Sequence, residues 1–213
     1  MTTDTRRPAG KRNRRMLRIV SLGLGILAMM ALGAIAQEHA APPLDEIRAE
    51  LIPEDGAETS YGIPLSLESL PQFVEWWYTL VPTAEGDPRY EEALSALVAP
   101  CCDDNLAFRC CCEGEEGQAC NIIRSGKGLA AHLILDYAFT ADDVRESVLE
   151  WFLFARPDYY LAVELEARGI DPETYGLTSE GSCYRGMCNV PISQGGCGGM
   201  LELVEPAIED VET

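Results

Sequence analysis

The residues best suited to chemistry in this sequence are its cysteines, because six of the nine lie between Pro100 and the start of an apolar segment. The six are Cys101, Cys102, Cys110, Cys111, Cys112 and Cys120. Thiolates attack disulfides and bind soft metal ions, and cysteine pairs also form structural disulfides. The stretch therefore predicts thiol chemistry, with disulfide exchange, metal binding and disulfide stapling as the three alternatives.

The spacing of these cysteines limits how they can pair. Adjacent Cα atoms lie about 3.8 Å apart, which is too close for an ordinary disulfide, so Cys101 and Cys102 need partners elsewhere. The intervals Cys102 to Cys110 and Cys112 to Cys120 are equal, which is compatible with two small disulfide-closed loops. Because nine is an odd number, at least one cysteine is a thiol, a metal ligand or bonded to another chain.

Cys110 and Cys112 are the candidate catalytic pair for disulfide exchange. The guanidinium of Arg109 favours the thiolate, which is the attacking species, whereas Glu113 and the glutamates after it oppose it. In this interpretation Cys110 attacks a partner's disulfide, and Cys112 or a neighbouring cysteine resolves the mixed disulfide.

A soft-metal site is the alternative interpretation of the same stretch. Its candidate ligands are Cys101, Cys102, Cys110, Cys112 and Cys120. Four thiolates suit zinc or an iron–sulfur cluster, and cysteine together with methionine suits Cu(I). His132 could approach from the next helix as a further ligand, but a core or surface histidine is the simpler interpretation.

A second group of soft side chains lies near the C-terminus. Cys183, Cys188 and Cys197 stand among glycines, with Met187 and Met200 close by. So many glycines disfavour a regular helix or strand, so we expect a loop that can fold back over the main cysteine stretch. A disulfide to that stretch is the preferred role, and a copper site of cysteine and methionine is the alternative.

The N-terminal segment is typical of export. Seven of the sixteen basic residues precede an uncharged apolar run from Ile19 to Ala36, which ends in a small-x-small pattern. Residues 1–36 are therefore predicted to be a signal peptide, or a membrane anchor through 19–36 if the segment is retained. Residues 37–64 contain prolines and glycines and are predicted to be a linker with a short helical turn at 44–51.

The remainder of the chain favours helices. Apolar periodicity and caps predict helices over Ser69–Leu80, Pro88–Val98, Gly126–Tyr137, Thr140–Ala155 and from Pro157 to Gly169. No segment alternates convincingly as a strand. We therefore expect a mainly α fold, a small three- to four-helix bundle with a cysteine-rich loop at one end. The helical cysteine-rich domain covers 65–180, and 181–213 form a Gly/Cys-rich loop and an acidic tail.

Composition narrows the class of partner. The 213-residue chain is 47% hydrophobic, which is enough for a modest core, and carries a net charge of −19. The exported part is more acidic still, because the N-terminal segment holds so many of the basic residues. A surface this negative repels phosphate backbones, so nucleic acid is excluded as the expected partner.

One family resemblance follows from these motifs. Phe108-Arg109-Cys110 followed by Cys112 resembles the Leu-Arg-Cys-x-x-Cys loop of the CcmH-like thiol proteins of cytochrome c maturation. The order of helices over 88–156 is also similar, including a helix that opens at Thr140. The same region is more loosely similar to the PCYCGC-motif proteins. The CcmH-like resemblance implies a membrane-tethered extracytoplasmic thiol–disulfide protein that acts on an exported cysteine-containing protein such as an apocytochrome.

Overall fold

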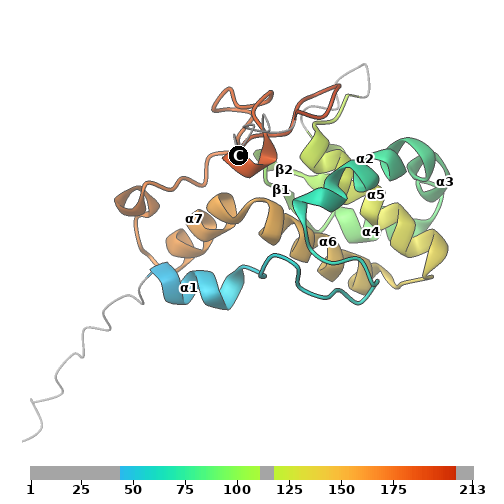
Figure 1. Cartoon of the computed structure of the whole chain (residues 1–213), viewed down its shortest axis with the longest axis horizontal. Helices are drawn as coiled ribbons and strands as arrows, with labels where there is room; N and C mark the ends of the chain where they lie inside the picture. The colour runs from blue at the N-terminus through green and yellow to red at the C-terminus, as the bar shows by residue number, and fades with distance from the viewer. Residues whose placement is uncertain (1–43, 111–117, 205–213) are drawn as a thin grey trace, which may run out of the picture. The chain divides into compact units, whose positions relative to one another are not determined.

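The computed structural model describes residues 44–110 and 118–204, so the predicted signal or anchor segment lies outside the described residues. Within these ranges the protein is mainly helical, which confirms the predicted fold class (Figure 1). The helices are α1 (Leu44–Leu51), α2 (Leu70–Thr79), α3 (Val81–Ala84), α4 (Pro88–Leu94), α5 (Asn121–Asp136), α6 (Ala141–Ala155) and α7 (Pro157–Ala167). Short 3-10 turns are η1 (Leu67–Ser69), η2 (Ala107–Arg109), η3 (Pro172–Tyr175) and η4 (Ile192–Gln194). None of the helices in the described ranges is both long and apolar enough to cross a membrane.

Helix α5 is the centre of the core. Most of its residues are buried, and α2, α3, α4 and α6 all pack against it. Close packing with α2 depends on Gly128, because a Cβ atom there would lie 1.9 Å from the carbonyl oxygen of Phe73. The predicted bundle of α4, α5 and α6 is confirmed, since each of these helices contacts the other two.

Local sequence accounts for several helix ends. Asp87 accepts a hydrogen bond from the Arg89 amide at the start of α4, and Pro88 occupies the first turn. Thr140 and Asp143 form a capping box at the predicted start of α6, because each side chain bonds to the other residue's backbone amide. Gly169 follows α7 with φ +75°, the left-handed conformation that glycine adopts without strain.

The segment before the cysteines differs from its prediction. The helix expected to run to Val98 ends at Leu94, and the chain then forms an antiparallel hairpin of β1 (Val98–Ala99) and β2 (Cys102–Leu106). The hairpin is extended by a hydrogen bond from the Ala107 amide to the Leu97 carbonyl. The expectation that no strand forms was therefore wrong here, because cross-strand pairing outweighs the helical periodicity of a short apolar segment.

The expected linker also contributes to the fold. Helix α1 packs on α7, where Ile47 is buried with Leu161 and Leu165. Further along, Tyr61 and Leu65 are buried in the main core. Helix α2 ends at Thr79, before Pro82, which lies in the first turn of the short helix α3.

Candidate metal centre

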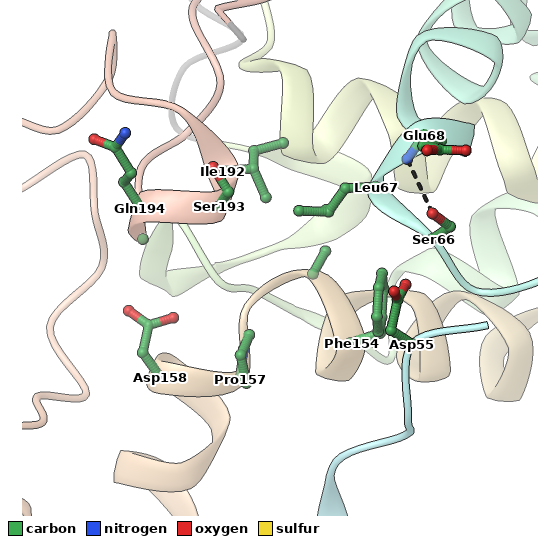
Figure 2. A pocket seen from close by; sticks show the side chains of 12 residues that line it. Asp55, Ser66, Leu67, Glu68, Phe154, Pro157, Asp158, Ile192, Ser193 and Gln194 are labelled. Carbon is green, nitrogen blue, oxygen red and sulfur yellow. Dashed lines mark hydrogen bonds between the residues drawn. The ribbon is translucent and has the colours of Figure 1, made fainter. Parts of the chain in front are cut away.

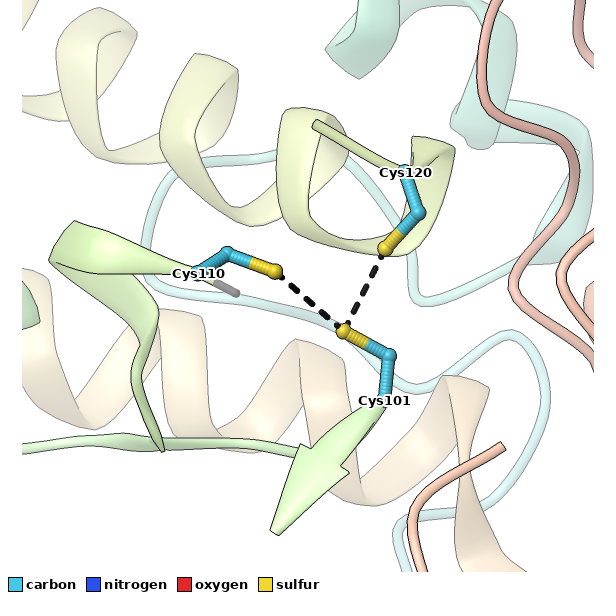
Figure 3. A group of neighbouring side chains, drawn as sticks. All are labelled: Cys101, Cys110 and Cys120. Atoms are coloured by element: carbon cyan, nitrogen blue, oxygen red, sulfur yellow. Dashed lines mark hydrogen bonds between the residues drawn. The ribbon is translucent and has the colours of Figure 1, made fainter. Parts of the chain in front are cut away.

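Three cysteine side chains converge inside the protein. The Sγ atom of Cys101 lies 3.3 Å from that of Cys120 and 3.6 Å from that of Cys110. All three residues are buried, and their sulfur atoms lie within 4.8 Å of one another. Figure 3 shows the three sulfurs pointing toward a common point from three different segments. A group with this geometry could hold a metal ion.

Each of these cysteines is placed by a different element. Cys101 lies in the tight turn between β1 and β2, where Ala99 pairs with Cys102. Cys110 follows η2 in an extended conformation, and Cys120 is the N-cap residue of α5. Because hairpin, turn and helix are all packed into the same core, the three sulfurs are held by the tertiary structure rather than by one local motif.

Cys102 adds a fourth sulfur to the group. It is disulfide-bonded, and its Sγ atom lies 3.7 Å from that of Cys101 and 3.9 Å from that of Cys110. Four of the five predicted metal ligands are thus brought together. The fifth, Cys112, lies outside the described residues, as does Cys111. Of the predicted catalytic pair only Cys110 is described, and it is 3% exposed.

The sulfur spacing determines what the group can bind. Tetrahedral zinc with Zn–S bonds of about 2.3 Å requires thiolates about 3.8 Å apart. The Sγ atom of Cys101 lies 3.6 Å from that of Cys110, close to this value, and 3.3 Å from that of Cys120, so a zinc ion would require a small outward shift of the sulfurs. An iron–sulfur cluster would need the cysteines spread around several atoms, so the geometry favours a site for a single ion.

Charge near the sulfurs is compatible with bound thiolates. The guanidinium of Arg156 is buried and donates to the Pro100 carbonyl next to Cys101, at 3.4 Å, while it also pairs with Asp158. The N-terminus of α5, at Cys120, favours negative charge. Burial raises the pKa of Tyr159 to about 12, so this nearby phenol stays neutral and adds no negative charge.

The C-terminal loop covers this group, as predicted. The Cys183 amide donates to the Cys101 carbonyl at 3.0 Å. The amides of Asn121 and Ile122, at the start of α5, donate to carbonyls of the loop at Gly199 and Cys197. These bonds explain why α5 begins five residues before its predicted start, since the loop supplies the acceptors that a capping side chain would otherwise provide.

The loop's own cysteines form a separate pair. The Sγ atoms of Cys183 and Cys188 lie 3.2 Å apart, whereas Cys197 is buried against the start of α5. In the described ranges, Cys101, Cys110 and Cys120 form the only group of three or more His, Cys, Asp or Glu side chains that lie close enough to share an ion. The copper site of cysteine and methionine suggested for this loop stays a prediction.

His132 takes no part in the cysteine group. Its ring stacks on Trp76, with centroids 3.8 Å apart, and Nδ1 lies 2.6 Å from a carboxylate oxygen of Asp136. It is twelve residues beyond Cys120 on the same helix, which corresponds to about 18 Å along the axis. The structure therefore supports the simpler interpretation, in which His132 is a core or surface histidine and not a metal ligand.

Sequence reasoning did not find Arg156 or the pocket beside it. Figure 2 shows this pocket of about 660 Å³, which includes Asp158, Ile192 and Phe154 among its lining residues. Asp55 and Glu68 also line it, but these carboxylates do not converge to ligand distances with Asp158. The sequence shows only that an arginine precedes Pro157, and this does not indicate that the Arg156 side chain is buried.

Comparison with known proteins does not assign this chain to a family or a fold. No protein family, no curated protein and no solved structure matches this chain. The geometry and chemistry of the cysteine group itself are therefore the basis for inferring function.

Proposed function

We propose that this chain is an exported soft-metal-binding protein, in which Cys101, Cys110 and Cys120 bind one zinc or copper(I) ion. The observation that carries the proposal is the convergence of three buried sulfurs from three separate segments. Thiolate ligands of one ion must lie at about such distances from one another.

The choice of ion follows from ligand type and number. Three thiolates suit trigonal copper(I), and a fourth ligand completes the tetrahedral arrangement that zinc prefers. Cys102 is placed for that fourth position once its disulfide is reduced, because its sulfur is already within 3.9 Å of two members of the group. A closed four-thiolate site is structural or serves storage and delivery, since it leaves no open position for a substrate.

Disulfide exchange is the second candidate, and one observation favours it. The disulfide at Cys102 lies next to the sulfurs of Cys101 and Cys110, so an internal thiolate could attack it. In this proposal Cys110 and Cys112 serve an exported partner such as an apocytochrome, as the CcmH-like resemblance implies. The burial of Cys110 counts against it, because attack on another protein requires access to the sulfur.

The deciding experiment is metal analysis of the full chain purified under reducing conditions without oxygen. The metal proposal expects one zinc or copper ion per chain, and its loss in Cys101→Ser, Cys110→Ser and Cys120→Ser. Cys188→Ser is the matched control, because this cysteine lies in the C-terminal pair outside the group. If the protein binds no metal while Cys112→Ser traps a partner in a mixed disulfide, the exchange proposal replaces the metal proposal.

A further inference from the structure

A cleft of about 560 Å³ borders the residues that lead into the cysteine group. Trp77 and Tyr78 of α2, Phe108 and Arg109 of η2 and Lys127 of α5 line it. The volume lies in the range of small-molecule sites, which are mostly apolar with a few polar groups that orient the ligand. The cleft is separate from the sulfurs, although Arg109 is the residue before Cys110.

The described lining of the cleft includes cations, although the protein as a whole is acidic. The chain as a whole carries a net charge of −19. Among the described residues, the lining includes two cations, Arg109 and Lys127, and one carboxylate, that of Glu85. Both cations lie over the Phe108 ring, with Cζ of Arg109 at 5.9 Å and Nζ of Lys127 at 5.8 Å from its centroid. Cations beside an apolar wall favour an anionic ligand.

A third cation lies behind the aromatic wall. Arg124 is 2% exposed, and its guanidinium lies 4.7 Å from the Trp77 ring centroid and 5.4 Å from that of Tyr78. Its Nη1 donates to the Tyr78 hydroxyl at 2.9 Å, which fixes this ring at the edge of the cleft.

The positive charge of this buried guanidinium is only partly compensated by its neighbours. In the described part of the chain Arg124 makes no ion pair with a carboxylate, and its Nε has no hydrogen-bond partner. Burying a cation without an opposite charge is costly, and aromatic faces offset only part of that cost. An anion in the neighbouring cleft would supply the opposite charge.

We propose that this cleft binds a small organic anion that carries an aromatic ring. The ring would lie against Trp77 and Phe108, and the anionic group would face Arg109 and Lys127. Stacking on aromatic side chains accounts for the apolar walls, and the charge-assisted hydrogen bonds account for the cations. The proposal does not depend on metal binding at the cysteines.

Three naphthalene compounds of nearly equal shape test the proposal: naphthoate, naphthylmethanol and naphthylmethylammonium. Titration calorimetry with the full chain should give about tenfold tighter binding of naphthoate than of the alcohol, since hydrogen bonds to charged groups contribute more. The ammonium compound should bind most weakly. Arg109→Gln should remove most of the preference for naphthoate and leave binding of the alcohol unchanged, because this exposed residue supplies charge rather than packing.

Arg145→Gln is the matched control, since this arginine of α6 pairs with Asp142 and does not line the cleft. It should bind naphthoate as the unchanged chain does. The proposal is overturned if none of the three compounds binds, if naphthoate and the alcohol bind equally, or if both arginine variants lose the same affinity.

Discussion

The Sγ atoms of Cys101 and Cys120 lie 3.3 Å apart, although the two residues are 19 positions apart in the chain. Cys101 belongs to the turn of the β1–β2 hairpin, and Cys120 caps the central helix α5. An ion held by these sulfurs would therefore join the hairpin to the helix on which most of the core is built. Metal binding and stability of the fold are expected to change together.

Metal removal should lower the thermal stability of the loaded protein. A chelator should reduce the midpoint of thermal unfolding, and acidification should have the same effect because protons compete with the ion for thiolates. The Cys101→Ser variant should show no chelator-dependent change. Equal midpoints for the loaded protein with and without chelator, measured by calorimetry, would contradict a bound ion at this group.

Reduction of the disulfide at Cys102 should strengthen metal binding. A small dithiol would convert Cys102 to a thiol, with sulfur distances of 3.7 and 3.9 Å to Cys101 and Cys110. Zinc affinity, measured by competition with a chromophoric chelator, should then rise at least about tenfold, because a fourth thiolate completes the tetrahedron. Cys102→Ser should bind one ion with an affinity that reductant does not change. Reductant-independent affinity in the unchanged chain would argue against Cys102 as a ligand.

The capping box of α6 gives a prediction for stability and its dependence on pH. Thr140→Ala should lower the free energy of unfolding by about 1 kcal/mol at neutral pH. Hydrogen bonds from Thr140 lower the pKa of Asp143 from its usual 3.8, so the ionised carboxylate stabilises the fold above that pH. This contribution is lost as the pH falls through the lowered pKa, so the difference between variant and unchanged chain should shrink in acid.

Thr79→Ala is the control for this measurement. Thr79 is also exposed, but it lies at the end of α2 and bonds back to the Glu75 carbonyl without capping a helix start. Its replacement should change the free energy of unfolding by less than about 0.5 kcal/mol. Urea denaturation at neutral and acidic pH measures both variants. Equal effects of the two substitutions would show that the cap contributes little.

Close contact between α2 and α5 makes Gly128 sensitive to a single methyl group. Alanine normally stabilises a helix relative to glycine by about 0.5 to 1 kcal/mol. At Gly128, however, the Cβ would lie 1.9 Å from the Phe73 carbonyl oxygen, and backbone atoms cannot move aside without separating the helices. Gly128→Ala should therefore destabilise the protein by about 1 to 3 kcal/mol.

Gly86→Ala is the matched control, because the nearest atom to its Cβ, the Thr83 carbonyl oxygen, would be 3.8 Å away. That substitution should be close to neutral. Denaturant midpoints that are equal for the two variants would mean that α2 and α5 tolerate a wider separation.

The N-terminal sequence gives a prediction about location. A reporter that is active only outside the cytoplasm, fused after Thr213, should be active in cells. The basic residues before Ile19 and the apolar run to Ala36 motivate this expectation. Deletion of residues 1–36 should abolish the reporter's activity. Activity confined to a cytoplasmic reporter would contradict export.

Interactions between near neighbours in the chain were predictable from the sequence. The cap at Asp87, the capping box of Thr140 and Asp143 and the stop at Gly169 each depend on residues within one helical turn. The apolar periodicity of α6 likewise indicated which of its faces is buried. For this reason the mainly α fold and the order of most helices could be predicted.

Contacts between distant segments were decided only by the tertiary structure. Residue types around 98–106 did not indicate a hairpin, because strand pairing depends on a partner strand as well as on local preference. The start of α5 at Asn121 depends on carbonyl groups near residue 198, which no local pattern reveals.

In the candidate site, too, the sequence predicted one part and the tertiary structure decided the other. The sequence alone identified a dense cysteine stretch, and hence thiol or metal chemistry, but left the ligand set open. Packing of the hairpin and η2 against the start of α5 brought Cys101, Cys110 and Cys120 together and placed His132 elsewhere. Coordination depends on distances between side chains in space, and residues far apart in a sequence acquire those distances only when the chain folds.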